Sequence, residues 1–205
     1  MNITINDGRG EGLGWYSPFR ENNEVEPGNV ISQNWDMEGF YLHGNILTMQ
    51  GGYNFTTPLG YDGFKSGDIF IDVNGGGYDY VARISNVGVS YDVYSMGVAS
   101  NVYYAQNALS NPWRYKDGGE VLEENVAINY TSFLDGEGMH YIANLNMDWL
   151  MDRLTYGDNV VFHYTMECGN DNLMGQYDHI VPESHSGGYL VGATVLALVI
   201  YNKLR

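Results

Sequence analysis

The sequence predicts an all-β protein: an antiparallel two-sheet sandwich, jelly-roll-like in its connections, with a C-terminal hydrophobic helix. Glycine accounts for 27 of the 205 residues, and 18 tyrosines and 4 tryptophans accompany it, as in domains of short strands and tight turns. About ten segments alternate apolar and polar residues or are rich in β-branched and aromatic residues. Because no long amphipathic helical pattern separates these segments, we expect two packed antiparallel sheets.

The predicted strands follow one another closely along the chain. Residues 35–55 form a hairpin, since His43-Gly44-Asn45 joins two strand-like segments with residues typical of a turn. Residues 68–73 are the clearest strand, and residues 160–168 place Cys168 on an apolar face. The other predicted strands are 2–6, 15–19, 78–84, 89–94, 98–106, 121–133 and 139–146. We expect a loop at 108–119 and a short helix at 147–154.

Length and composition indicate one folded domain at residues 1–180 and a separate tail at 181–205. Hydrophobic residues make up 44% and charged residues 17%, which excludes a disordered chain. The formal net charge of −16 repels phosphate backbones, so we expect no nucleic-acid partner. A single cysteine, Cys168, excludes an internal disulfide and is predicted to be a buried thiol.

Acidic residues in loops and around the clearest strand predict a structural calcium ion. Carboxylate oxygens are the hard ligands that Ca²⁺ prefers, and such an ion would tie an early loop to a late strand. The alternative is that these side chains accept hydrogen bonds from backbone groups in their own turns. The candidate ligands are Glu24, Glu26, Asp68, Asp72 and Asp171.

Aromatic side chains in or beside loops predict a site where a sugar could stack. Trp113 and Arg114 suit a planar, polar ligand, and Trp15 is a third candidate. Tyr103 and Tyr104 lie close by in the sequence. The alternative is that these rings pack in the core.

The sequence predicts no catalytic site. Asp36 and Glu38 lie two residues apart on one predicted strand, as the two carboxylates of a glycosidase could. In so acidic a chain such pairs also arise by chance. The five histidines are scattered and are predicted to be solvated loop residues, which disfavours zinc chemistry.

The C-terminal tail contains an uncharged, mostly apolar run at residues 187–201. A bilayer-spanning helix needs about 20 residues, so the run is short. Tyr189 and Tyr201 flank it as interfacial aromatics do, and Lys203 and Arg205 follow. The run is therefore either a membrane-anchor helix or a final buried segment of the domain.

Val181-Pro182-Glu183, the apolar run and the basic end together resemble the PEP-CTERM sorting signal of exosortase-bearing Gram-negative bacteria. The signal normally has a second proline, where this chain has Ser184, and a richer basic end. Stretches across most of the domain are also similar to one family of PEP-CTERM surface proteins. They are residues 14–16, 23–28, 35–40, 51–55, 66–72, 78–81, 110–114 and 165–171.

The resemblance implies export by a signal peptide that this chain does not carry, and an extracellular or outer-surface location. It also implies processing by an exosortase-type enzyme, transient membrane contact through the tail, and association with exopolysaccharide or biofilm. It implies no catalytic activity. We therefore expect a non-catalytic cell-surface or extracellular-matrix protein that binds carbohydrate. The alternatives are a self-assembling filament or surface-layer subunit, and an enzyme acting on polysaccharide.

Overall fold

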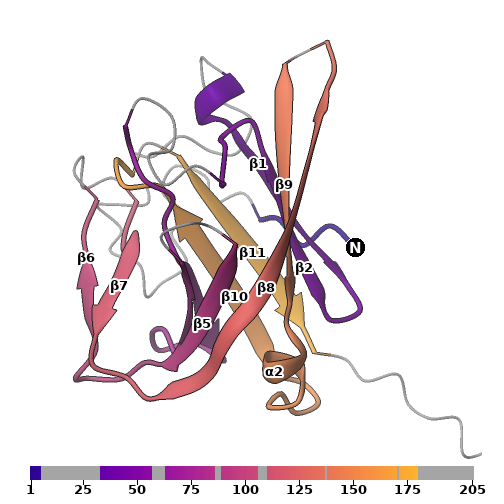
Figure 1. Ribbon diagram of the computed structural model, residues 1–205. Helices are drawn as coiled ribbons and strands as arrows, with labels where there is room; N and C mark the ends of the chain where they lie inside the picture. The colour runs from indigo at the N-terminus through magenta and orange to yellow at the C-terminus, as the bar shows by residue number, and fades with distance from the viewer. Residues whose placement is uncertain are drawn as a thin grey trace, which may run out of the picture.

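The protein is an all-β structure in a computed structural model that describes residues 1–5, 33–56, 63–85, 89–105, 110–136, 138–169 and 171–179 (Figure 1). The strands are β1 (Met37–His43), β2 (Ile46–Gly51), β3 (Ile69–Val73), β4 (Tyr80–Ile84), β5 (Ser90–Ser95), β6 (Asn101–Tyr103), β7 (Arg114–Asp117), β8 (Val121–Leu134), β9 (Met139–Asn146), β10 (Asn159–Thr165) and β11 (Asn172–Asp178). Two short helical turns accompany them, η1 (Gln33–Trp35) and α2 (Asp148–Met151).

Nine strands form one antiparallel sheet in the order β1-β2-β9-β8-β5-β4-β3-β10-β11, and β6 and β7 form a second, small sheet. The prediction of two separate large sheets is corrected here, because β8 belongs to both halves. Its first residues, up to Ala127, pair with β5, and its residues from Ile128 onward pair with β9. The 14-residue strand thus carries the sheet from one layer to the other, and the sandwich is one curled sheet.

The chain start nearly closes this curled sheet. Ile3 N–H donates to the Phe40 carbonyl of β1 at 3.0 Å, and Ile5 N–H donates to the Met174 carbonyl of β11 at 3.0 Å. In return, Leu42 and Gln176 donate their backbone N–H groups to this segment, each at 2.8 Å. Residues 1–5 therefore lie between the two edge strands of the large sheet, as the predicted strand at 2–6 requires.

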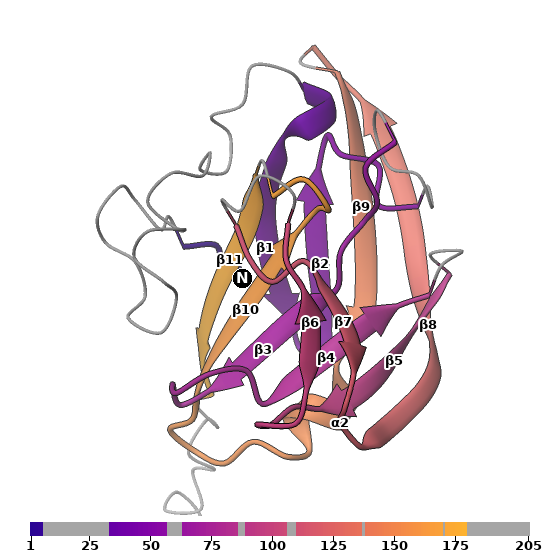
Figure 2. The ribbon, with the colours of Figure 1, turned by 90° about the vertical axis from the view of Figure 1, so that its left-hand side faces the viewer.

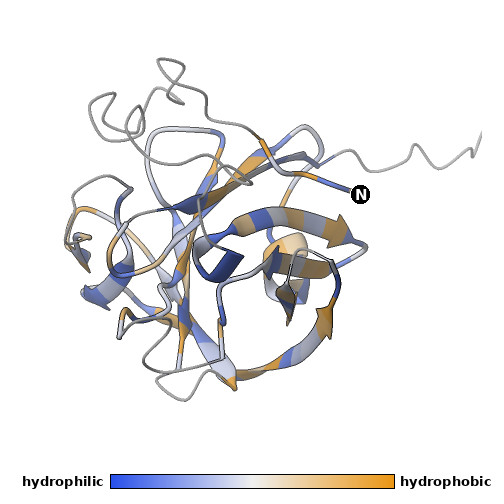
Figure 3. Cartoon of the chain, turned by 90° about the horizontal axis from the view of Figure 1, so that it is seen from above, coloured by the Kyte–Doolittle hydropathy of each residue, from blue (hydrophilic) through white to orange (hydrophobic). Residues whose placement is uncertain are grey.

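The main core lies inside the curled sheet. Along β10, Val160, Phe162 and Tyr164 are fully buried and face the side chains of the opposite half. Seen from above, the strands surround a central space, with hydrophobic and hydrophilic residues alternating along several of them (Figure 3). Cys168 is buried in the same cluster, as predicted.

The small sheet β6–β7 covers the outer face of β3, β4 and β5 (Figure 2). There Phe70, Val81 and Tyr115 form a second buried cluster. Tyr94 of β5 stacks on Tyr115 of β7 with ring centroids 4.7 Å apart. The central strands of the large sheet are consequently buried on both faces, which the alternation of apolar and polar residues does not predict.

Several predictions for individual elements need correction. Strand β7 lies within the predicted loop at 108–119, and β11 follows the last predicted strand, 160–168, in a part of the chain for which no strand was predicted. The jelly-roll-like connection is not supported by the strand order, because most neighbours are consecutive hairpin partners: β1–β2, β3–β4, β4–β5, β8–β9 and β10–β11. The predicted strand at 15–19, the C-terminal hydrophobic helix and the whole tail at 181–205 lie outside the described residues. Among the described residues, no helix is long and apolar enough to cross a membrane.

Candidate ligand-binding site

An open hollow of about 820 Å³ lies beside the small sheet, between the β3–β4 turn and the segment around β6. Its volume falls within the range of about 300–1,000 Å³ that is typical of small-molecule sites. Apolar, aromatic and polar side chains share its lining. The residues that matter most for its chemistry are Tyr78, Asp79, Met96, Tyr104, Asn111 and Pro112.

The β3–β4 turn forms one rim of the hollow and is shaped by Asp72. One carboxylate oxygen of Asp72 accepts the Gly75 N–H at 2.8 Å, and the other accepts the Gly77 N–H at 3.2 Å. Gly75 and Gly77 have φ angles of 80° and 125°, which side chains other than glycine rarely adopt. The Asp72 carboxylate and the glycines therefore give this rim a fixed backbone shape without side chains.

Asn111 lines the hollow, but its side-chain amide is largely enclosed by protein. Its side-chain oxygen accepts the backbone N–H of Ala105, which settles the orientation of the amide group. The side chain is 7% exposed, and its Nδ2 has no hydrogen-bond partner among the described residues. A buried amide donor without an acceptor is rare in folded proteins, and this nitrogen is enclosed by protein and does not open into the hollow.

Tyr78 joins the hollow to a rigid interior. Its ring stacks on the His163 ring with centroids 6.0 Å apart, and His163 Nε2 lies 3.0 Å from Ser110 Oγ. Burial lowers the pKa of His163 to about 3, so this histidine is neutral at physiological pH. Tyr104, in contrast, is 63% exposed and presents its ring to solvent beside the hollow.

The predicted sugar-stacking residues lie differently from what the sequence suggests. Trp113 is 7% exposed, with the Tyr103 ring 6.3 Å away and the Arg114 guanidinium 5.8 Å above its ring. Trp113 is therefore packed within the protein, and the exposed aromatics of this region are Tyr104 and, at 47% exposed, Tyr103. Trp15 lies outside the described residues.

The structure does not bring the described calcium candidates together. Asp68 accepts the Ile84 and Tyr115 N–H groups at 2.9 and 2.8 Å, which fastens β7 to the large sheet. Asp171 accepts the N–H groups of Met37 and Asn172 at 2.8 and 2.9 Å. Asp72 is bound to its own turn, and no group of three metal-ligand side chains occurs among the described residues. Glu24 and Glu26 lie outside them, so calcium binding remains a prediction.

Asp68 is fully buried, as Asp72 and Asp171 are. Burial raises its pKa to about 7, although the nearby Arg114 charge and the two backbone N–H groups act in the opposite direction. A carboxyl group that accepts two backbone N–H bonds in the interior has a structural role here.

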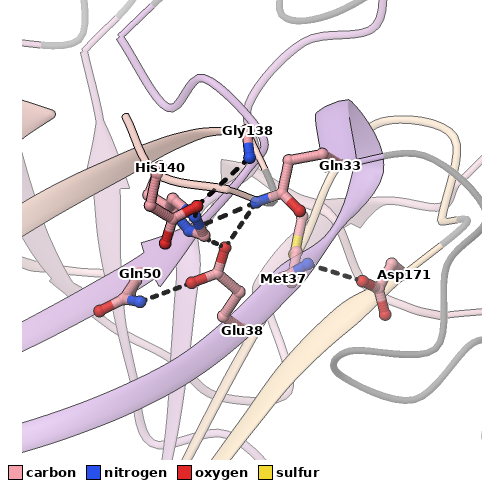
Figure 4. A network of polar contacts seen from close by, with 8 residues as sticks. Gln33, Met37, Glu38, Gln50, Gly138, His140 and Asp171 are labelled. Atoms are coloured by element: carbon pink, nitrogen blue, oxygen red, sulfur yellow. Dashed lines mark hydrogen bonds and ion pairs between the residues drawn. The ribbon is translucent and has the colours of Figure 1, made fainter. Parts of the chain in front are cut away.

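A second polar cluster lies away from the hollow, across the neighbouring strands β1, β2 and β9 (Figure 4). His140 Nδ1 lies 2.5 Å from Glu38 Oε1, and its Nε2 lies 2.9 Å from Asp135 Oδ1. Gln33 and Gln50 donate to the two oxygens of Glu38 at 2.8 and 2.5 Å. Burial alone would lower the pKa of His140, but the hydrogen bonds and charges of Asp135 and Glu38 raise it.

This cluster changes two predictions. His140 and His163 are buried, so the prediction that the histidines are solvated loop residues is wrong for both. Glu38, one of the two carboxylates considered as a glycosidase pair, binds a histidine and two glutamines. The sequence could not place Glu38 beside His140, because 102 residues separate them.

Comparisons with protein-family models, with curated proteins and with solved structures each gave no match for this chain. The site must therefore be interpreted from its own geometry. The sequence pointed to this region through its aromatic residues but missed Asn111, which in an Asn-Pro sequence resembles an ordinary turn residue. Its unpartnered amide becomes visible only in three dimensions.

Proposed function

We propose that this protein is a non-catalytic carbohydrate-binding protein of the cell surface or extracellular matrix, and that the hollow binds the sugar. The observation that carries the proposal is the tyrosine-lined hollow of about 820 Å³, beside which Tyr104 is 63% exposed. Aromatic rings offer flat apolar faces to the C–H surfaces of a sugar, while convergent polar groups orient its hydroxyls.

Substitution of Tyr104 tests the proposal. Tyr104→Ala removes the exposed ring beside the hollow and should weaken binding of a matching tetrasaccharide about tenfold or more. Calorimetric titration with neutral tetrasaccharides of glucose, mannose, galactose and N-acetylglucosamine measures the affinity. Tyr156→Ala is the matched control, because Tyr156 is 68% exposed and does not line the hollow. Equal affinities for both variants, or no binding to the wild type, would reject the proposal.

The extracellular location and the processed tail are proposals that rest on the resemblance of Val181-Pro182-Glu183 and the following run to a sorting signal. Exposure to an exosortase-type enzyme should remove the chain after this motif. Intact-mass measurement of protein recovered from cells and from the medium tests both points. A full-length chain in the medium would contradict the anchor function of the tail.

Two alternatives fit the described geometry less well. A self-assembling subunit needs free strand edges, and residues 1–5 bridge both edge strands of the large sheet. A glycosidase needs two carboxylates facing its substrate, and Asp79 is the one carboxylate among the described residues that line the hollow. We therefore place the binding function first.

A further inference from the structure

We infer that the hollow selects amino sugars, and that the Asp79 carboxylate binds their protonated amine while the Tyr104 ring packs on the face of the sugar. This inference rests on the proposed function and adds the ligand class and the two groups that recognise it. Three features of the described lining lead to this assignment: the orientation of the Asp79 carboxylate, the charge around the hollow and the exposure of Tyr104.

The Asp79 carboxylate is held in place where it lines the hollow. The backbone of Asp79 donates to the Ile71 carbonyl at 2.9 Å and accepts the Met96 N–H at 2.6 Å. Its side-chain Oδ2 accepts the Val73 N–H at 2.7 Å, whereas Oδ1 accepts no hydrogen bond within the described part of the chain. The residue is only partly buried. An oriented carboxylate oxygen of this kind can accept a charge-assisted hydrogen bond from an ammonium group, which is stronger than a bond between neutral groups.

The charges around the hollow favour a cation at Asp79. No lysine or arginine lines the hollow among the described residues, so no basic side chain of the lining competes for this carboxylate. The net charge of −16 adds long-range attraction of cations. A protonated amine that enters the hollow therefore meets a carboxylate without a competing basic group.

The neighbouring Asp72 strengthens this preference without binding the ligand itself. Both of its oxygens accept backbone N–H groups of the turn, from Gly75 and Gly77. Burial raises the pKa of Asp72 and the nearby charge of Asp79 raises it further, although the two N–H groups act in the opposite direction. The two carboxyl groups therefore lie close enough to interact, and a cation at Asp79 would relieve their repulsion.

The two tyrosines that line the hollow differ in what their rings can contact. The Tyr78 ring packs against the Phe70 and His163 rings, with centroids 5.0 and 6.0 Å away. Tyr104 is 63% exposed beside the hollow. Such a ring attracts the apolar C–H face of a sugar and also a nearby cation. An oligosaccharide of amino sugars can offer an amine to Asp79 and a ring face to Tyr104 at the same time.

Two tetrasaccharides that differ only in the group on their nitrogen test the inference by calorimetric titration at pH 6. The glucosamine tetrasaccharide carries protonated amines, and the N-acetylglucosamine tetrasaccharide carries neutral acetamido groups. Asp79→Asn keeps an acceptor for the Val73 N–H but removes the negative charge. Asp152→Asn is the matched control, because it removes the same charge from an exposed residue that does not line the hollow.

We expect the wild type to bind the amine sugar at least about tenfold more tightly than the acetylated sugar. Asp79→Asn should lose about tenfold or more in affinity for the amine sugar and much less for the acetylated one. Asp152→Asn should bind both sugars as the wild type does. In the wild type, the Val73 N–H signal should shift more with the amine sugar than with the acetylated sugar, because its acceptor is the Asp79 carboxylate. This last measurement tests Asp79 even if Asp79→Asn does not fold.

Acetylated sugar that binds as tightly as the amine sugar would overturn the selectivity and leave the proposed function standing. Full affinity of a folded Asp79→Asn protein for the amine sugar, an equal loss in Asp152→Asn, or an unmoved Val73 signal would overturn the role of Asp79. Tetralysine carries ammonium groups without sugar rings, so equally tight binding of tetralysine would overturn the assignment to sugars. If neither tetrasaccharide binds, the proposed function fails and the inference fails with it.

Discussion

His140 and His163 occupy equally closed positions, yet their pKa values are shifted in opposite directions. They are 4% and 0% exposed, respectively. His163 lies among the rings of Phe70 and Tyr78, and burial lowers its pKa to about 3. His140 lies between two carboxylates that raise its pKa despite burial. The neighbours of a buried histidine, and not its burial alone, decide in which direction its pKa moves.

The two histidines also affect stability in opposite directions as pH changes. Below pH 6.5 the unfolded chain protonates His163 while the folded protein does not, so stability is lost as pH falls from 6.5 towards 3. His140 holds its proton to a higher pH in the folded protein than in the unfolded chain. The contribution of His140 to stability is complete below pH 6.5 and is lost as the pH rises through its raised pKa in the folded protein.

The largest effect is expected from His163→Gln, which removes the histidine that stays neutral in the folded protein. Between pH 6.5 and 3, the wild type should lose up to about 1.4 kcal/mol of unfolding free energy per pH unit relative to this variant. Urea unfolding at several pH values measures the difference. The variant also loses the bond to Ser110, so it should be less stable than the wild type at pH 7 by roughly 1–3 kcal/mol.

The test compares the unfolding free energies of the wild type and His163→Gln at each pH, because Asp68 titrates in an overlapping pH range. Its pKa of about 7 gives it the opposite sign, since its stability contribution falls as pH rises from 3.8 to 7. Ring signals of His163 that move between pH 8 and pH 5 in the folded wild type would contradict the assignment of a neutral imidazole. This measurement does not depend on any variant.

A smaller effect is expected from Glu38→Gln, which removes one of the two charges beside His140. The pKa of His140 should fall, since the amide cannot stabilise the protonated ring as the carboxylate does. We expect a loss of about 1–3 kcal/mol in unfolding free energy at pH 6. Proton NMR titration of the imidazole follows the pKa. An unchanged pKa would mean that Glu38 does not set the charge of His140.

The smallest effect is expected from Asp135→Asn. The Asp135 side chain is 45% exposed, whereas that of Glu38 is 16% exposed, so solvent screens the Asp135 pair more strongly. We expect a loss of about 0.2–1 kcal/mol at pH 6. Urea unfolding beside Glu38→Gln gives the ranking. If Asp135→Asn were the more damaging change, exposure would not explain the difference between the two carboxylates.

The sequence predicted the strands whose side chains alternate and missed those whose contacts are distant. Along β10, Phe162 and Tyr164 were placed correctly on an apolar face. Val161, His163 and Thr165 on the opposite face are also buried, because β10 lies inside the sheet with other segments over its outer face. The alternation of apolar and polar residues indicates which face of a strand packs in the core, but it does not show what covers the opposite face.

The candidate site was predicted less well than the fold. Tyr104 was identified as a loop aromatic, but Trp113 was preferred to it, because ring size in the sequence does not reveal burial. Asp72 was identified as an acidic residue of interest, and its role is to hold a turn. The role of a carboxylate depends on the backbone N–H groups that reach it, and those are set by the completed fold.

Residues 1–5 could allow two molecules of this protein to exchange strands at high concentration. A segment held by a few backbone bonds on each side opens locally more easily than the whole domain does, and amide exchange at Ile3 and Ile5 should report this. When the segment leaves, β1 and β11 become free edges at the same moment. The first residues of a second molecule fit the gap they have left, so strand-exchanged dimers should accumulate as the concentration rises.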